Sequence, residues 1–188
     1  GQTDFGGPQR RAIAGDTVWY SLTNDGTDWT QTNPTFTDVT AETTVYVKVT
    51  NANYSDRLGQ GTVTITVRPI SILAGSDSKT YDGAALTSNT WTLSAGTLAG
   101  TETISAVTVT GSQTVVGSSS NVPSGAVILD GATNVTSNYD ITYQNGTLTV
   151  TAAMGNELDI ADYSGVYDSE SHGITVENAI AGDTGWYS

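Results

Sequence analysis

The chain has no cysteine among its 188 residues, so disulfide bonds and thiolate chemistry are excluded. Basic residues are scarce as well: six Lys and Arg stand against nineteen Asp and Glu, which gives a net charge of -13. From Tyr81 to Ser188 the chain contains neither Lys nor Arg. A surface this acidic repels phosphate backbones and anionic lipid, so the composition argues against binding nucleic acid or docking on a membrane surface.

Long apolar runs are missing too. No stretch approaches roughly 18 consecutive apolar residues, so we expect no membrane insertion in this part of the protein. No leader or anchor motif is visible, and we expect those signals to lie outside the 188 residues. We interpret the acidity as a means of keeping a long molecule soluble and self-repelling.

Histidine is limited to His172, which lies in Ser169-Glu-Ser-His-Gly173. A Ser-His-acid relay would depend on this one residue, and zinc needs several nitrogen or sulfur ligands. We therefore interpret His172 as an exposed loop residue. Among nineteen acids some pairs must lie close together, but small β-sandwich repeats rarely enclose the cleft that glycoside hydrolysis requires. The sequence predicts that the chain is not an enzyme.

The residues that are abundant favour strands. Thr, Val, Ile, Tyr and Trp suit a pleated, half-buried surface, and several segments alternate an apolar residue with Thr. This alternation predicts strands with one face on a core and one in water, at residues 44–50, 61–67, 104–110 and 146–151. Asn-Asp-Gly and Asn-Gly predict tight hairpin turns at 24–26 and 145–146. The predicted fold class is all-β, with tandem immunoglobulin-like β-sandwich domains.

Internal repetition sets the organisation of the chain. Ile13-Ala-Gly-Asp-Thr-Val-Trp-Tyr-Ser21 returns as Ile180-Ala-Gly-Asp-Thr-Gly-Trp-Tyr-Ser188, an offset of 167 residues. Trp19 and Trp186 are therefore one repeat position seen twice, and we expect Trp19 to anchor a core. Residues 1–12 are the exception, because they do not match the corresponding residues before Ile180. We interpret them as foreign or divergent sequence.

A fainter repeat divides each period in two. Thr80-Tyr-Asp-Gly83 resembles Val166-Tyr-Asp-Ser169, and residues 53–67 resemble 138–150. We accordingly expect a domain at 1–69 that lacks its opening strands, a complete domain at 70–153, and the start of the next copy of the first type at 154–188. Arg68-Pro69 is the expected hinge, since proline ends ladder pairing.

These repeats resemble the MBG and YDG domains of bacterial surface proteins, which are immunoglobulin-like modules of adhesins and cell-wall proteins. The resemblance rests on Tyr81-Asp-Gly83 and on Asn138-Tyr139 followed by Asn145-Gly-Thr-Leu-Thr-Val150. It implies an extracellular setting at the bacterial cell surface or cell wall. It also implies a non-catalytic stalk or spacer repeat whose partners are its neighbouring repeats. No mucin-binding site motif of such relatives is matched here.

Two kinds of ligand site have candidates. Clustered carboxylates provide hard oxygen ligands, so calcium is a candidate cofactor at Asp25 and Asp28, and again at Asp159, Asp162 and Asp168. Exposed aromatic rings bind sugars, so Trp29 and Trp91 are candidates for a host glycan. The chain alternatively suits a glycan- or mucin-binding adhesin module. A third hypothesis is a head-to-tail extracellular filament, in which residues 155–188 of one chain complete the first domain of the next by strand exchange.

Overall fold

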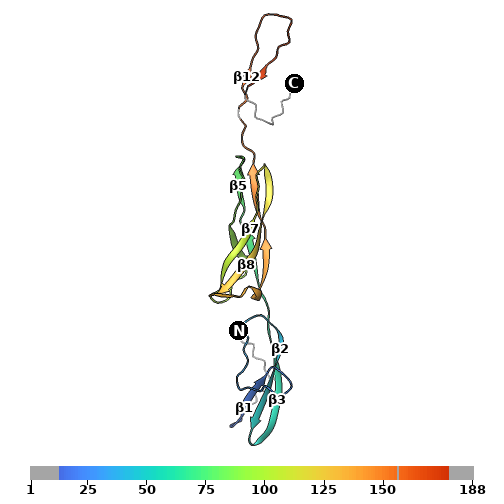
Figure 1. Cartoon of the computed structure of the whole chain (residues 1–188), viewed down its shortest axis with the longest axis vertical. Coiled ribbons are helices and arrows are strands. Elements are labelled where there is room, and N and C mark those ends of the chain that lie inside the picture. The colour runs from blue at the N-terminus through green and yellow to red at the C-terminus, as the bar shows by residue number, and fades with distance from the viewer. Residues whose placement is uncertain (1–12, 156, 178–188) are drawn as a thin grey trace.

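The computed structural model describes residues 13–155 and 157–177 and is all-β and sandwich-like, as the composition predicts. Figure 1 shows an elongated molecule in which a first unit (residues 13–65), a middle unit (residues 68–151) and a terminal segment (residues 157–177) follow one another. Apart from strands, the described residues contain one 3-10 turn, η1 (Thr136–Asn138). The repeated Ile180–Ser188, with Trp186, lies outside the described residues.

The first unit is built on one antiparallel sheet in the order β1-β2-β3, from β1 (Thr17–Ser21), β2 (Thr40–Asn51) and β3 (Tyr54–Ile65). The alternating Val residues of β2 lie on one side of this sheet, together with one residue each from β1 and β3. We call this side the valine face, and its residues are Tyr20, Val45, Val47, Val49 and Val63. Among the described hydrophobic residues of the first unit, Val45 alone is buried, at 8% exposure. The unit therefore has a much smaller core than the middle unit.

Trp19 does not anchor that core, contrary to the sequence-based expectation. It lies opposite Lys48 in the ladder, whereas its neighbour Tyr20 lies opposite Val47. Because ladder partners project to the same side of a sheet, Trp19 lies on the polar side and Tyr20 on the valine face. The Trp19 ring is half-buried and its Nε1 donates a hydrogen bond of 3.1 Å to Thr50 Oγ1.

Two sheets form the middle unit. One has the order β10-β4-β6 and consists of β4 (Arg68–Ala74), β6 (Trp91–Ala95) and β10 (Tyr139–Gln144). The other has the order β5-β11-β8-β7, with β9 paired to β8, and consists of β5 (Asp77–Thr80), β7 (Thr103–Thr110), β8 (Gly117–Asp130), β9 (Thr133–Asn134) and β11 (Gly146–Thr151). Ile70 of β4 packs with Ile128 of β8, so a shared core joins the two sheets.

The first and last strands of the middle unit run side by side through both sheets. β4 pairs in parallel with β10 and β5 pairs in parallel with β11, and in both ladders each residue faces the one 71 positions later. Both segments change sheet at the same level, where Gly146 contacts Gly75. A Cβ on Gly146 would lie 2.2 Å from Gly75 O, so only glycine fits there. The predicted hairpin at Asn145-Gly146 is therefore wrong, because β10 and β11 lie in different sheets.

Asn121 stabilises this change of sheet. It lies opposite Gly146 in the β8–β11 ladder and is completely buried. Its Nδ2 donates hydrogen bonds of 2.9 Å to Gly75 O and 3.0 Å to Ser88 O. Gly75 lies in the break between β4 and β5, and Ser88 lies in the loop before β6. The Asn121 side chain therefore pairs backbone groups where the chain leaves one sheet.

The expected hinge at Arg68-Pro69 is replaced by a strand. Both residues belong to β4 and pair with Tyr139 and Asp140 of β10. Pro69 is tolerated because pairing with β6 begins at Ser71, which leaves no ladder bond at Pro69 on that side. The predicted strand at 61–67 accordingly ends at Ile65, and two residues separate β3 from β4.

The terminal segment carries a small two-stranded sheet of β12 (Ile160–Ala161) and β13 (Thr175–Val176). Most of its apolar side chains are exposed: Leu158, Ile160, Tyr163, Val166, Tyr167 and Ile174. Val166 and Tyr167 are 89% and 90% exposed. The described part of this segment thus presents apolar surface without a core to bury it.

Candidate functional site: a groove on the first unit

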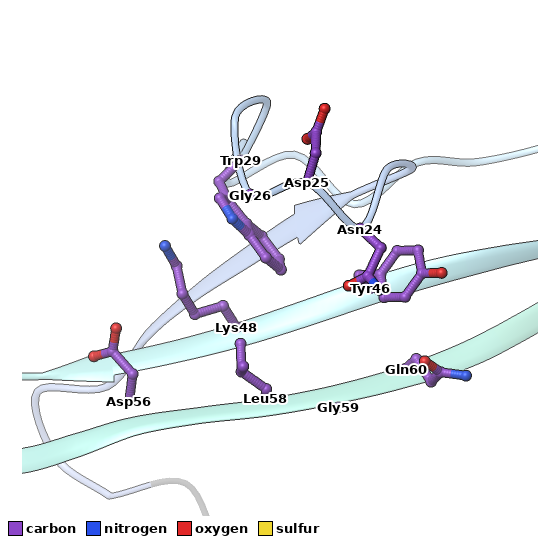
Figure 2. A pocket seen from close by; sticks show the side chains of 10 residues that line it. All are labelled: Asn24, Asp25, Gly26, Trp29, Tyr46, Lys48, Asp56, Leu58, Gly59 and Gln60. Atoms are coloured by element: carbon purple, nitrogen blue, oxygen red, sulfur yellow. The ribbon is translucent and has the colours of Figure 1, made fainter.

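A cavity of about 520 Å³ opens on the polar side of the first sheet. Figure 2 shows how three elements build it: the loop after β1, which carries Trp29, and the facing strands β2 and β3. The lining residues are Asn24, Asp25, Gly26, Trp29, Tyr46, Lys48, Asp56, Leu58, Gly59 and Gln60. Tyr46 and Lys48 alternate with the buried Val45 and its neighbours, so the strand period that builds the valine face also directs these two side chains into the groove.

Trp29 forms one wall of the groove and is half-buried. Lys48 Nζ lies 4.8 Å from the centre of the Trp29 ring, a cation–π distance that fixes the ring over β2. Tyr46 supplies a second aromatic ring, and the side-chain amides of Asn24 and Gln60 lie at the same opening (Figure 2). The groove thus combines two aromatic surfaces with amide donors and acceptors.

The loop that positions Trp29 is held by its own hydroxyl and carboxylate groups. Asp25 accepts hydrogen bonds from Thr23 Oγ1 at 2.8 Å and from the N–H and hydroxyl of Thr27. These bonds, that of Thr23 first, hold the pKa of Asp25 below its usual value. Gly26 adopts a φ of 75°, as the predicted turn at 24–26 requires.

Asp28 lies at the base of the same loop. It accepts hydrogen bonds from the hydroxyls of the buried Ser21 and of Thr23, and the bond from Ser21 is the main reason why its pKa is lowered. The structure therefore brings Asp25 and Asp28 together around Thr23, as the sequence suggested. Within residues 13–155 and 157–177 no group of three or more Asp, Glu or His side chains is arranged to hold a metal ion, and calcium at this loop stays a prediction.

The other candidate residues lie away from the groove. Trp91 begins β6 in the middle unit, where it is half-buried opposite Ala74. Asp159 and Asp162 lie in the terminal segment, far along the chain from Asp25 and Asp28, so the two carboxylate clusters do not form one site.

His172 is in a loop, as expected, but it is not isolated. Its ring stacks on Tyr163 with centroids 4.0 Å apart, and its Nε2 lies 2.8 Å from Asp168 Oδ1. The hydrogen bond from His172 is the largest cause of the lowered pKa of Asp168.

Several groove residues escaped the sequence analysis. Tyr46, Asn24 and Gln60 were not proposed as site residues, because their proximity depends on the register between β2 and β3 and on the fold of the loop. The available signal was the pair Tyr46 and Lys48, two bulky side chains at the positions that alternate with Val45, Val47 and Val49 in the strand.

Comparisons with known proteins give no relative: no family model, no curated protein and no solved structure matches the chain. In the described part of the molecule, no helix is long and apolar enough to cross a membrane. What the chain does is accordingly inferred from its own geometry.

Proposed function

We propose that the chain is a structural stalk repeat of a bacterial cell-surface adhesin or cell-wall protein, made of tandem immunoglobulin-like domains of the MBG and YDG type. In this role each unit extends the molecule and positions a distal binding region. The proposal includes an extracellular location and neighbouring repeats as the main partners. It assigns no catalytic activity to the chain.

The contact between the first and middle units carries this proposal. The Asn138 side chain, at the end of η1, accepts a hydrogen bond of 2.8 Å from the Val39 N–H and donates one of 2.8 Å to Asp38 Oδ1. We call this contact the Asn138 bridge. Together with the two-residue link between β3 and β4, it restrains the end-to-end arrangement seen in Figure 1. A short, bridged link favours an extended rod over freely jointed beads.

The charge distribution supports the same role. Repeats that carry a net charge of -13 repel their neighbours, so an array of them resists folding back on itself. Solution scattering from chains of one, two and three 167-residue periods tests the proposal. A stalk requires the maximum dimension to grow by a constant step with each period, whereas a collapsed array would grow by smaller and smaller steps.

Asn138→Ala is expected to loosen the link between the units while leaving each unit folded. The change removes both hydrogen bonds of the bridge, and because these are exposed the free energy of unfolding should fall by less than about 1 kcal/mol. Small-angle X-ray scattering should report a broader distribution of interatomic distances than in the unchanged chain. Ser137→Ala, at the exposed neighbouring position, is the matched control. Identical scattering from both variants would show that the bridge does not hold the units in line.

A second candidate function is supported by the groove. Two aromatic rings, Trp29 and Tyr46, lie beside the amides of Asn24 and Gln60. Sugars present apolar C–H faces to aromatic rings and hydroxyls to amides, so this combination suits a glycan- or mucin-binding module. The opening is about large enough for a few sugar residues, at about 520 Å³.

Trp29→Ala tests that candidate directly. If the groove binds host glycan, the variant should bind a glycan array at least about tenfold more weakly, a loss of about 1.4 kcal/mol, because the stacking surface is gone. Tyr54→Ala removes an exposed aromatic ring on β3 that does not line the groove and should leave binding unchanged. Absence of array binding by a chain of several periods would remove the candidate.

A further inference from the structure

Among the described residues, no strand lies along the outer edge of β3. In the described part of the chain β3 pairs with β2 alone, so its other side presents a row of N–H and C=O groups along residues 54–65. Nearly all of these residues are exposed, Leu58 to 75%. An edge strand of this length is a template for adding another strand. The edge of β1, by contrast, is partly covered by the bridge between Tyr20 and Thr30.

The terminal segment contains a sequence related to β5 and the turn that follows it. The sequence repeat pairs Tyr81-Asp-Gly83 with Tyr167-Asp-Ser169, and the structure gives both the same turn. Gly83 has a φ of 81° and Ser169 a φ of 72°, and Ser169 is the one described non-glycine residue with positive φ. In each turn the aspartate Oδ1 accepts a hydrogen bond from the backbone N–H two residues later, Ala84 in one case and Glu170 in the other. The turn at residues 167–170 therefore repeats the turn at 81–84 in conformation as well as in sequence.

The first copy of this turn is preceded by a paired strand. Residues 77–80 form β5, which runs parallel to β11 with Leu148 opposite Asp77 and Val150 opposite Lys79. The pairing continues into the turn, where the Tyr81 N–H donates a hydrogen bond of 2.8 Å to Thr151 O. In the second copy, residues 163–166 have no ladder partner among the described residues.

The counterpart of β11 is the end of β3. Gly146-Thr-Leu-Thr-Val150 aligns with Gly61-Thr-Val-Thr-Ile65, so Val63 takes the place of Leu148 and Ile65 that of Val150. We propose that residues 163–166 of one copy of this chain pair in parallel with the open edge of β3 in a second copy. The register carried over from β5 and β11 places Tyr163 opposite Val63, Ser164 opposite Thr64, Gly165 opposite Ile65 and Val166 opposite Thr66.

The apolar surfaces match in this register. Ladder partners project to the same side, so Tyr163 joins Val63 on the valine face, the side that is poorly buried in the first unit. Ser164 and Thr64 meet on the polar side. Pairing would satisfy the open backbone groups of β3 and would cover part of the apolar surface that the terminal segment exposes.

The proposed partner is a second copy because the two surfaces do not meet within the described residues. The first unit and the terminal segment lie at opposite ends of the elongated chain, separated by the whole middle unit (Figure 1). Pairing between chains is head to tail and heterologous, so it continues from one molecule to the next. Pairing between chains is a separate proposal from the role as a stalk, which concerns units within one chain. An experiment can contradict one of these two proposals and leave the other standing.

Engineered cysteines test the register, and the natural chain, which has none, provides a clean background. A Thr64→Cys chain mixed with a Ser164→Cys chain should form a disulfide-linked heterodimer, because directly opposite residues lie within the Cα separation that a disulfide spans. Thr62→Cys mixed with Ser164→Cys is the matched control, shifted by two residues. We expect at least roughly tenfold more heterodimer from the first mixture. Equal yields from both mixtures, or no heterodimer from either, would overturn the proposal.

Self-association of the full chain provides the second test. Sedimentation equilibrium should give a mass that rises above 19.5 kDa with concentration. Gly165→Pro removes an N–H within the pairing segment and should hold the mass at that of the monomer. Ser171→Pro lies beyond the segment and should behave like the unchanged chain. A monomer mass for the unchanged chain at every concentration, or equal association of Gly165→Pro, would contradict the proposal.

Discussion

Gly146→Val is expected to lower the free energy of unfolding of the middle unit by at least about 3 kcal/mol, which is a large share of the stability of a small domain. A Cβ at this position would lie 2.2 Å from Gly75 O and 2.6 Å from Ala74 O. Both are backbone atoms of the neighbouring segment, so no side chain can rotate away to relieve the contact. The strain must separate the two segments at the level where both change sheet.

Urea denaturation followed by circular dichroism measures this effect. Gly59→Ala is the matched control, because a Cβ at Gly59 meets nothing within 4 Å and its φ is ordinary. The control should change the free energy of unfolding by less than about 0.5 kcal/mol. A Gly146→Val chain that unfolds at the same urea concentration as the control would show that the close approach at Gly75 is not a constraint on the fold.

Asn121→Leu should cost about 2 to 4 kcal/mol of the free energy of unfolding, the second large effect. Leucine fills a similar volume, so the loss would come from hydrogen bonding more than from a cavity. Without the amide, the carbonyls of Gly75 and Ser88 lose their buried donor, and each unpaired group costs about 1 to 3 kcal/mol.

The midpoint of thermal unfolding measures this effect in Asn121→Leu, with Asn89→Leu as the control. Asn89 is exposed, so its substitution should shift the midpoint little, whereas Asn121→Leu should lower it by several degrees per kcal/mol lost. Equal midpoints would mean that the two carbonyls find other partners and that the Asn121 amide does not stabilise the change of sheet.

The strands could be predicted from the sequence wherever one face is apolar and the other polar. The predicted strands at Thr44–Thr50 and Ile104–Thr110 fall within β2 and β7. Strict alternation of apolar and polar residues indicates a strand with one buried face. Asn145-Gly146 was misread because its local signal is that of a hairpin, while the need for glycine comes from Gly75, a residue distant in the sequence. Long-range contact, not local conformation, decides such a position.

The candidate site was partly predictable for the same reason. The loop at Asn24-Asp-Gly26 was found because turn chemistry is local, and Trp29 was proposed because an exposed aromatic ring can bind a sugar. Gln60 lies opposite Tyr46 in the groove because of the register between β2 and β3, and a single sequence does not specify that register. Trp19 was expected to anchor the core by analogy with immunoglobulin-like sandwiches. The ladder instead pairs it with Lys48, because the alternation of side chains along the strand decides which face each one takes.

The parallel course of the first and last strands has a consequence for how the middle unit carries load. Its chain enters at Arg68 and leaves at Thr151, at opposite ends of two ladders that hold one constant register. A pull on the two ends slides residues 68–80 against residues 139–151 along their length. The backbone hydrogen bonds of both ladders are then loaded together, in shear. If the two strands were instead joined by a hairpin at Asn145-Gly146, a pull on their ends would break the hydrogen bonds between them one after another.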